Sequence, residues 1–248
     1  MIKEAEKIIT WIKDYVRDTR AKGVVLGMSG GKDSLVSAAL CTRALGKDKV
    51  LGVIMPNGEM ADITDALDTC KFLGIDYEII DISTAYKNII EETQFTLQGR
   101  NASISSVTTI NTPPRLRMTI LYALAGSLNY LVVNTSNLSE IMVGYSTKWG
   151  DSAGDIAPLA YYTKSEVCEI GLTLTLPEHL LNKTPSDGLS GKSDEEKLGF
   201  TYTELDTFIR TGKKGNSYDK ILSSHTKTAH KRSRIPRPIS NKPNYFDN

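Results

Sequence analysis

Residues 27–34, "GMSGGKDS", combine glycine, hydroxyl, lysine and carboxylate groups at a spacing that suits phosphate chemistry. They follow the apolar residues "VVL" and precede a stretch with helical character. Such a junction exposes unpaired backbone N–H groups at the positive end of a helix dipole, where anions bind. Glycine lets the backbone approach an oxyanion closely. We therefore predict a phosphate-binding loop made of Gly27, Met28, Ser29, Gly30, Gly31, Lys32, Asp33 and Ser34.

The loop departs twice from the commonest nucleotide-binding pattern, G-x-x-x-x-G-K-[ST]. Gly31 and Lys32 match the end of that pattern, but Leu26 occupies the position of its first glycine. Asp33 occupies the position of the hydroxyl residue that would bind the metal. The loop is therefore a phosphate-binding turn of another kind.

Short apolar strands alternate with helices around this loop. We predict strands at 23–28, 49–55, 76–82 and 130–134. We predict helices near the N-terminus and at 33–45, 61–74 and 114–128, with a mobile or interface loop at 99–114. This alternation indicates an α/β fold: a three-layer, doubly wound parallel sheet, with ligands at the edge where the strands end. After Tyr161 the pattern becomes helical and rich in loops.

The composition indicates an ordinary globular protein. The chain has 248 residues, of which 40% are hydrophobic and 24% are charged, and its net charge is +1. This balance gives no overall attraction to nucleic acid or anionic lipid, so neither is expected as a partner. The sequence has no run of about 18 apolar residues and no signal-peptide core, so we expect one cytoplasmic domain spanning 1–248.

The chain contains three cysteines, at isolated positions. Cys41, Cys70 and Cys168 form no C-x-x-C pair and are odd in number. We therefore expect buried, reduced thiols and neither disulfides nor zinc ligands.

The S-G-G-x-D-S core of the loop resembles that of the ATP pyrophosphatases with the adenine nucleotide α-hydrolase-like fold. In that family the loop grips the β- and γ-phosphates of ATP while a substrate attacks the α-phosphate, so that AMP is transferred and pyrophosphate leaves. The resemblance implies that 27–34 binds ATP. It also implies that Asp33 holds Mg²⁺, because a carboxylate is a stronger hard-oxygen ligand than a hydroxyl.

Further motifs, in order along the chain, are similar to those of NAD synthetases. They are "NTPPRLRMTILYALAG" (111–126), "NTSNLSEIMVGYSTKWGD" (134–151), "DIAPLAYYTKSEV" (155–167), "KTPSDGL" (183–189), "SDEEKLGFTYTELD" (193–206) and "SSHTKTAHKR" (223–232). NAD synthetases adenylate the nicotinate carboxylate of deamido-NAD⁺, and ammonia then displaces AMP to form the amide. The resemblance implies a C–N bond-forming ligase that uses ATP, Mg²⁺ and ammonia.

The resemblance also assigns roles to single residues. Glu140 matches a second metal ligand beside Asp33. Lys164 matches a lysine that binds ATP phosphate, where it can stabilise charge on the leaving pyrophosphate. Asp151 is the candidate that assists deprotonation of ammonia. The matched ATP-contacting hydroxyls are Thr135 and Ser186, and the matched deamido-NAD⁺ contacts are Arg115, Lys148, Asp155, His230 and Lys231.

The segment 148–158 resembles a second substrate loop, which we expect to be a flexible lid that excludes water. Here the chain departs from the family. Ser152 and Ala153 replace two glycines, Asn134 stands where family members often have glycine, and Met60 stands where glutamine is usual. These departures affect the expected lid and the adenine contacts, and not the reaction class.

Two other functions remain open. Another ATP pyrophosphatase, modifying tRNA or forming GMP, would need a tRNA-binding appendage, a cysteine set or a dimerisation domain, none of which the sequence shows. A non-catalytic nucleotide-binding module would not need Asp33, Glu140 and Lys164 together.

Three further expectations come from the resemblance. The synthetase motifs use up the chain and no glutaminase domain is present, so we expect free ammonia as the nitrogen donor. The family generally forms homodimers with deamido-NAD⁺ at the interface, and we expect the helix at 114–128 to contribute. The basic tail at 225–238 is expected to close over substrate phosphates, although alone it could be a nucleic-acid-binding arm.

Overall fold

The computed structural model describes residues 1–58, 63–181 and 193–236. Its strands form one parallel sheet in the order β3-β2-β1-β4. Their bounds are β1 Gly23–Gly27, β2 Val50–Ile54, β3 Asp76–Ile79 and β4 Tyr130–Val132. Because β1 pairs with β2 on one side and β4 on the other, the strand order reverses at β1. The loops after β1 and β4 therefore meet at a topological switch point, where ligands bind in such sheets.

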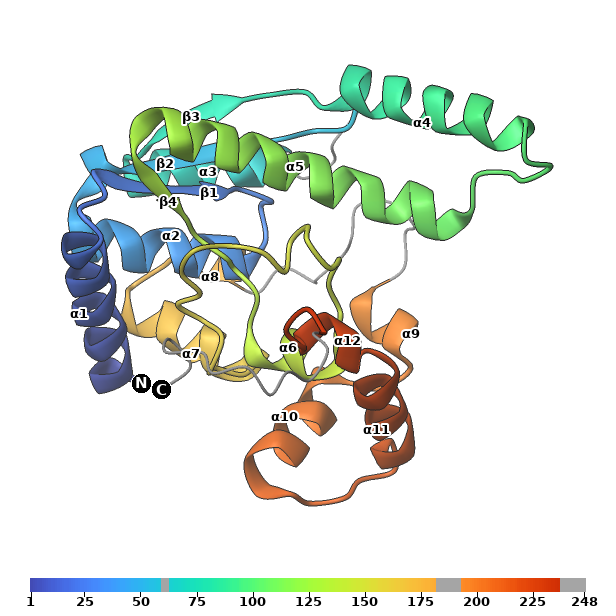
Figure 1. Cartoon of the computed structure of the whole chain (residues 1–248). Coiled ribbons are helices and arrows are strands. Elements are labelled where there is room, and N and C mark those ends of the chain that lie inside the picture. Colours follow the sequence, from blue (N-terminus) through green and yellow to red (C-terminus); the bar gives the residue numbers. More distant parts are fainter. Residues whose placement is uncertain (59–62, 182–192, 237–248) are drawn as a thin grey trace, which may run out of the picture.

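Helices cover both faces of this sheet, as Figure 1 shows. One face packs against α2 (Lys32–Leu45) and α3 (Ile63–Leu73). Three further helices pack against α2 and share its apolar core: α1 (Ile2–Asp18), α7 (Lys164–Thr173) and α8 (Glu178–Leu181). The other face packs against α5 (Ser106–Leu128). Along β1, Val24 and Leu26 point into the first core and Val25 into the second, as the pleat of a strand requires. The predicted three-layer α/β fold is confirmed.

Most of the predicted elements lie within a few residues of the observed ones, and the differences are at the periphery. All four residues of β3 are exposed, so this edge strand is not covered. The helix α4 (Ser83–Gln98) was not predicted, and a short 3₁₀ helix (Lys47–Lys49) precedes β2. The predicted 99–114 loop is helical from Ser106 onward.

The early start of α5 has a local cause. The hydroxyl of Ser105 accepts the backbone N–H of Thr108 (3.2 Å) and caps the helix. The helix then continues through Pro113 and Pro114. Each proline removes one backbone hydrogen bond, so a proline pair inside a helix is unusual. Burial of Pro113 shows that packing holds the helix together across it.

The C-terminal part is helical, as predicted, and has its own core. It consists of α6 (Leu138–Val143), α9 (Asp194–Leu198), α10 (Tyr202–Thr211), α11 (Tyr218–Lys227) and α12 (Ala229–Arg232). Its core residues are Val143, Phe200, Tyr202, Leu205 and Ile221. Capping boxes begin α6, α7, α9 and α10. In the described part of the chain, no helix has the length and apolar character needed to cross a bilayer.

The three cysteines differ in burial, which predicts different reactivity. Burial raises the pKa of Cys41 to about 12 and that of Cys70 to about 11. Cys168 is only half-buried, so the prediction of buried thiols is confirmed for the first two and not for the third. Because the thiolate is the nucleophile, iodoacetamide should modify Cys168 in the native protein and spare Cys41 and Cys70 until unfolding. Peptide mass spectrometry measures this, and rapid native modification of Cys41 would contradict it.

Candidate active site

The 27–34 loop turns sharply between β1 and α2. Gly30 has φ +76°, in the left-handed region that favours glycine. The hydroxyl of Ser29 accepts the backbone N–H of Gly31 (3.3 Å) and lies 3.2 Å from the hydroxyl of Ser34. Ser34 in turn donates to the carbonyl of Gly31 (2.9 Å). The loop therefore holds its shape through its own glycine and serines.

The N-terminus of α2 opens onto this loop. Its N-cap residue, Gly31, is extended, and no side chain of the described residues caps the helix. Lys32 and Asp33 are its first two residues, and both are half-buried. Uncapped N–H groups, the positive end of the helix dipole and a lysine side chain together form an anion site. The geometry suits phosphate, and the contacts of single loop residues with ATP stay predictions.

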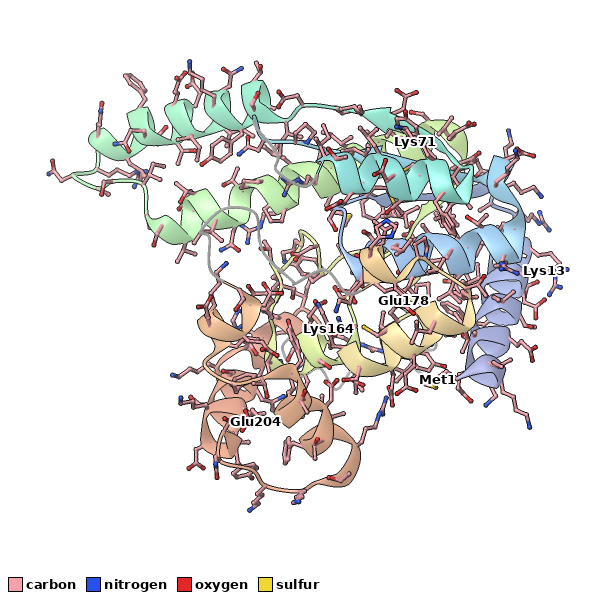
Figure 2. All side chains as sticks on the ribbon, turned by 180° about the vertical axis from the view of Figure 1, so that it is seen from behind. Met1, Lys13, Lys71, Lys164, Glu178 and Glu204 are labelled. Carbon is pink, nitrogen blue, oxygen red and sulfur yellow. The ribbon has the colours of Figure 1, made fainter. Side chains whose placement is uncertain are left out.

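Three charged side chains meet at the switch point. Lys164 Nζ lies 3.0 Å from Asp33 Oδ2 and 2.8 Å from Glu140 Oε1. The three residues belong to the first turns of α7, α2 and α6, and they are far apart in sequence. Figure 2 shows Lys164 in the interior, between α7 and the C-terminal helices. We call Asp33, Glu140 and Lys164 the charged centre.

Burial sets the electrostatics of the charged centre. Burial raises the pKa of Glu140 to about 7, and the ammonium of Lys164 lowers it only in part. Burial alone would lower the pKa of Lys164, but Asp33 and Glu140 outweigh it, so this pKa is well above its usual value. The centre therefore holds a charged ammonium between Asp33 and Glu140, and Glu140 loses its charge as the pH falls below about 7.

The carboxylates of the charged centre fit Mg²⁺. Both reach the same cation, the ammonium of Lys164, and both are oriented by Asn137. The side-chain amide of Asn137 donates to Asp33 Oδ1 (3.0 Å), and its backbone N–H donates to Glu140 Oε2 (3.3 Å). Mg²⁺ typically binds one or two carboxylates plus phosphate oxygens and water. Across the described residues, no three carboxylate, imidazole or thiol groups gather into a metal site, so ATP oxygens and water would complete the coordination.

Asn137 was not among the predicted site residues. Its spacing to Glu140 fits the N-x-x-E capping pattern, and the structure shows that both reciprocal bonds of a capping box are present. That pattern was a readable signal for the start of α6. The bond from Asn137 to Asp33 has no sequence signal, because it joins residues on two different loops.

A second group of predicted residues gathers around segment 144–148. Lys231 Nζ donates to two carbonyl groups of this segment, at 2.8 and 2.6 Å. Lys148 Nζ donates to the carbonyl of His230 (2.7 Å), and Arg115 Nε donates to the carbonyl of Lys148 (3.2 Å). Residues from α5, α12 and the intervening segment thus form one basic cluster. The structure brings these four predicted deamido-NAD⁺ contacts together, and their contact with substrate stays a prediction.

The two predicted aspartates of the substrate loop make internal bonds. Asp151 Oδ1 accepts the backbone N–H of Thr147 (2.6 Å), and burial raises its pKa. Asp155 accepts the backbone N–H of Val132 (2.8 Å) and the hydroxyl of Tyr122 (3.2 Å). Asp155 therefore joins this loop to β4 and α5. The roles of both carboxylates toward substrate stay predictions.

Hydrogen bonds fasten the 148–158 segment, and its role as a flexible lid stays a prediction. The side-chain amide of Asn134 donates to two carbonyl groups of the segment, at 2.8 and 2.9 Å. The hydroxyl of Ser152 donates to the carbonyl of Thr147 (2.9 Å). Asn134 and Ser152 are two of the departures from the family pattern, and their side chains fasten the loop.

The remaining predicted contacts are at the same edge of the sheet or outside the described residues. Thr135 is half-buried in the loop after β4, on the edge that carries the 27–34 loop. Ser186 and Met60 lie outside the described residues. Arg117, two residues after Arg115 on α5, donates to the carbonyl of Met55 (2.9 Å).

Gly144 ends α6 and lies against Thr228, so its substitution tests how closely the two segments pack. Gly144 has φ +64°, and a Cβ there would lie 2.3 Å from Cβ of Thr228, at the junction of α11 and α12. Gly144→Ala should destabilise the protein by about 2–4 kcal/mol, since left-handed strain adds to overpacking. Gly46→Ala is the control, because Gly46 has φ +85° but open space around it. Urea unfolding measures both, and equal losses would contradict the packing.

The family model described as NAD synthase matches residues 4–242 of this chain. The chain belongs to the NAD synthase family. It is 45% identical over 208 residues to the NH₃-dependent NAD⁺ synthetase of Thermococcus sibiricus, covering 84% of this chain and 79% of that protein.

Solved structures agree with the NAD synthase assignment. The NMN synthetase from Francisella tularensis superposes with a TM-score of 0.87 and 36% identity, covering 95% of this chain and 97% of that one. The NH₃-dependent NAD synthetase from Campylobacter jejuni gives a TM-score of 0.77 and 31% identity, with coverages of 96% and 98%. These findings confirm the predicted family, the adenine nucleotide α-hydrolase-like fold and the class of enzyme, a ligase. They also disfavour the two alternatives, another ATP pyrophosphatase and a non-catalytic nucleotide-binding module. The match to the NAD synthase model spans Asp33, Glu140 and Lys164.

Proposed function

We propose that the protein amidates deamido-NAD⁺ to NAD⁺ with ATP and ammonia, through a deamido-NAD adenylate, and releases AMP and pyrophosphate. The observation that carries this proposal is the charged centre beside the uncapped N-terminus of α2. A loop that binds phosphate next to two carboxylates and a lysine suits the departure of pyrophosphate. The relatives named NH₃-dependent NAD⁺ synthetases support the acceptor and the nitrogen donor.

In the first half-reaction, the nicotinate carboxylate attacks the α-phosphorus of ATP and the bond to the β-phosphate oxygen breaks. The 27–34 loop and the N–H groups of α2 would bind the β- and γ-phosphates. Asp33 and Glu140 would hold Mg²⁺, which when bound neutralises charge on the departing pyrophosphate. The ammonium of Lys164 would then be free to donate to a phosphate oxygen, because the metal takes over the carboxylates.

In the second half-reaction, ammonia attacks the acyl carbon of the adenylate and AMP leaves. Asp151 would accept a proton from the attacking nitrogen. Its burial favours this role, since a carboxylate with a raised pKa is a better base. The cluster of Arg115, Lys148 and Lys231 would meanwhile hold the substrate phosphates.

Product analysis tests this function. Incubation with ATP, Mg²⁺, ammonium and deamido-NAD⁺ should yield NAD⁺, AMP and pyrophosphate in equal amounts. Omission of deamido-NAD⁺ or of ammonium should stop NAD⁺ formation. ADP as the nucleotide product, or AMP release that does not require deamido-NAD⁺, would contradict the proposal.

A second candidate substrate is the mononucleotide that carries the same nicotinate carboxylate. The solved NMN synthetase from Francisella tularensis, at a TM-score of 0.87, favours it. The adenylation chemistry would be identical, so only the AMP half of the substrate distinguishes the two. The ratio of kcat/KM for deamido-NAD⁺ and for nicotinate mononucleotide decides between them. We expect deamido-NAD⁺ to be preferred, and a higher value for the mononucleotide would reverse the assignment.

We also propose a homodimer formed through α4 and α5. Figure 1 shows α4 and the first part of α5 side by side, extending beyond the sheet. No residue of α4 is buried, and it exposes Ile89 and Phe95, while α5 exposes Val107 and Ile110. Apolar side chains gathered on a surface commonly mark an interface. Sedimentation should give a dimer that Phe95→Glu converts to a monomer, and a monomeric native protein would contradict this.

A further inference from the structure

The motif "TYTELD" forms the start of α10, and α10 packs against the first turn of α7, where Lys164 is the first residue. Tyr202, Asp206 and Arg210 follow one another at intervals of four residues along α10. Side chains at this spacing lie on one side of a helix. Each of the three contacts the beginning of α7 in a different way.

Asp206 binds the backbone at the start of α7. Its Oδ2 accepts the backbone N–H (2.9 Å) and the hydroxyl (2.6 Å) of Ser165. Its Oδ1 accepts the hydroxyl of Ser139, which itself accepts the backbone N–H of Lys164 (3.0 Å). Only 7% of Asp206 is exposed. A buried carboxylate at a helix N-terminus is stabilised by the helix dipole, so Asp206 fixes the backbone that carries Lys164.

Tyr202 supports the other end of Lys164. The ammonium lies 4.8 Å from the centroid of the Tyr202 ring. The ring is buried, and its hydroxyl oxygen has no hydrogen-bond partner among the described residues. The ring face, and not the hydroxyl, is therefore the part of Tyr202 that Lys164 contacts. A desolvated cation–π contact of this kind is stronger than an exposed one.

Arg210 tightens the cap of α7 from outside. Its Nε donates to Glu166 Oε1 (2.7 Å), and its Nη2 donates to the carbonyl of Tyr161 (2.7 Å). Glu166 also accepts the backbone N–H of Thr163, the N-cap residue. This contact is more exposed than the other two and does not reach the ammonium of Lys164.

We propose that Tyr202 and Asp206 are positioning residues that direct the ammonium of Lys164 toward the phosphates of ATP. The two carboxylates of the charged centre also hold this ammonium. Those carboxylates are the groups that Mg²⁺ would occupy. With Mg²⁺ on those carboxylates, two supports of Lys164 remain. The Tyr202 ring contacts its ammonium, and Asp206 holds the backbone at the start of α7. The inference rests on the proposed function, because it assumes that Lys164 acts on ATP.

Substitutions of Tyr202 separate the ring from the hydroxyl. Tyr202→Phe keeps the ring face, so kcat/KM for ATP should stay within about 2-fold of wild type. Tyr202→Leu removes the ring and should lower kcat/KM for ATP by roughly 10- to 30-fold. This factor corresponds to the free energy of a buried cation–π contact. KM for deamido-NAD⁺ should not change in either variant. A loss in Tyr202→Phe equal to that in Tyr202→Leu would overturn the proposal.

Asp206→Asn gives a second arm that preserves side-chain volume. It removes the negative charge at the N-terminus of α7 and should lower kcat/KM for ATP by about 10-fold. Arg210→Ala is the matched control on the same side of α10, since it loosens only the exposed cap and should stay within about 2-fold. Equal losses in the two variants would indicate general loosening of α7 and would overturn the positioning role.

A double-substitution cycle shows whether the effect passes through Lys164. Lys164→Met alone should lower kcat/KM for ATP strongly, and Tyr202→Leu should then cause no further loss. A full additional loss in the double variant would overturn the proposal. An unchanged kcat/KM in Lys164→Met alone would instead show that the proposed function of Lys164 is wrong. Thermal unfolding of every variant confirms that folded protein is compared.

Discussion

Asp33→Ala lowers the rate of pyrophosphate release by about 1,000-fold and leaves the fold intact. An effect of this size is expected because the variant loses a metal ligand, and with it the stabilisation of negative charge in the transition state. The fold survives because Asp33 projects into the charged centre and not into an apolar core, and Lys164 keeps Glu140 as a partner. A coupled pyrophosphate assay measures the rate, and circular dichroism with thermal unfolding measures the fold.

Two further variants make this result specific. Asp33→Asn retains the size of the side chain but loses its charge, and it should lose about as much activity. Asp48→Ala removes an exposed carboxylate beyond the end of α2 and should retain wild-type activity. Wild-type turnover by Asp33→Ala would show that Asp33 is not a metal ligand.

Lys164→Met has opposite effects on two measurements. Turnover falls by about 1,000-fold, because the variant lacks the cation that stabilises the leaving pyrophosphate. Affinity of the ligand-free protein for Mg²⁺ rises, because the ammonium no longer competes for Asp33 and Glu140. Isothermal titration of Mg²⁺ into the protein without ATP measures the second effect.

The same substitution changes stability in a way that Mg²⁺ reverses. Removing one partner of a buried ion pair costs about 3–5 kcal/mol, here because two carboxylates are left without their cation. Mg²⁺ binds only the folded site, so it should raise the unfolding temperature of Lys164→Met more than that of wild type. Lys148→Met is the control, since Lys148 contacts the carbonyl of His230 and not the charged centre. Equal Mg²⁺ affinities of Lys164→Met and wild type would contradict the competition.

The sheet and its loops could be predicted because their signals are local. Residues 23–28 are a short apolar run followed by glycines, and such a run is readable as a buried strand. The α4 helix (83–98) could not be found in the same way, since none of its residues is buried and it has no apolar stripe that packs on the sheet. The start of α5 was misplaced because residues 99–114 are polar and interrupt the alternation of strands and helices, although Ser105 caps a helix that runs through them.

The site could be predicted in part. The family resemblance paired Asp33 and Glu140 as metal ligands, and the structure brings both to one ammonium. The contacts of Lys164 with the Tyr202 ring and with Asp206 depend on how α10 packs on α7, for which the sequence contains no local signal. The hydrogen bonds from Asn134 to the 148–158 segment could not be predicted either, because the sequence of a loop with few glycines does not show whether side chains fasten it.

Transfer of oxygen from substrate to AMP reports directly on the adenylate intermediate. Deamido-NAD⁺ is labelled with ¹⁸O in the nicotinate carboxylate and incubated with the protein, ATP, Mg²⁺ and ammonium. An adenylate intermediate leaves one carboxylate oxygen on phosphorus, so we expect one AMP with a single ¹⁸O atom for each NAD⁺ formed. Unlabelled AMP, or label in inorganic phosphate, would contradict it.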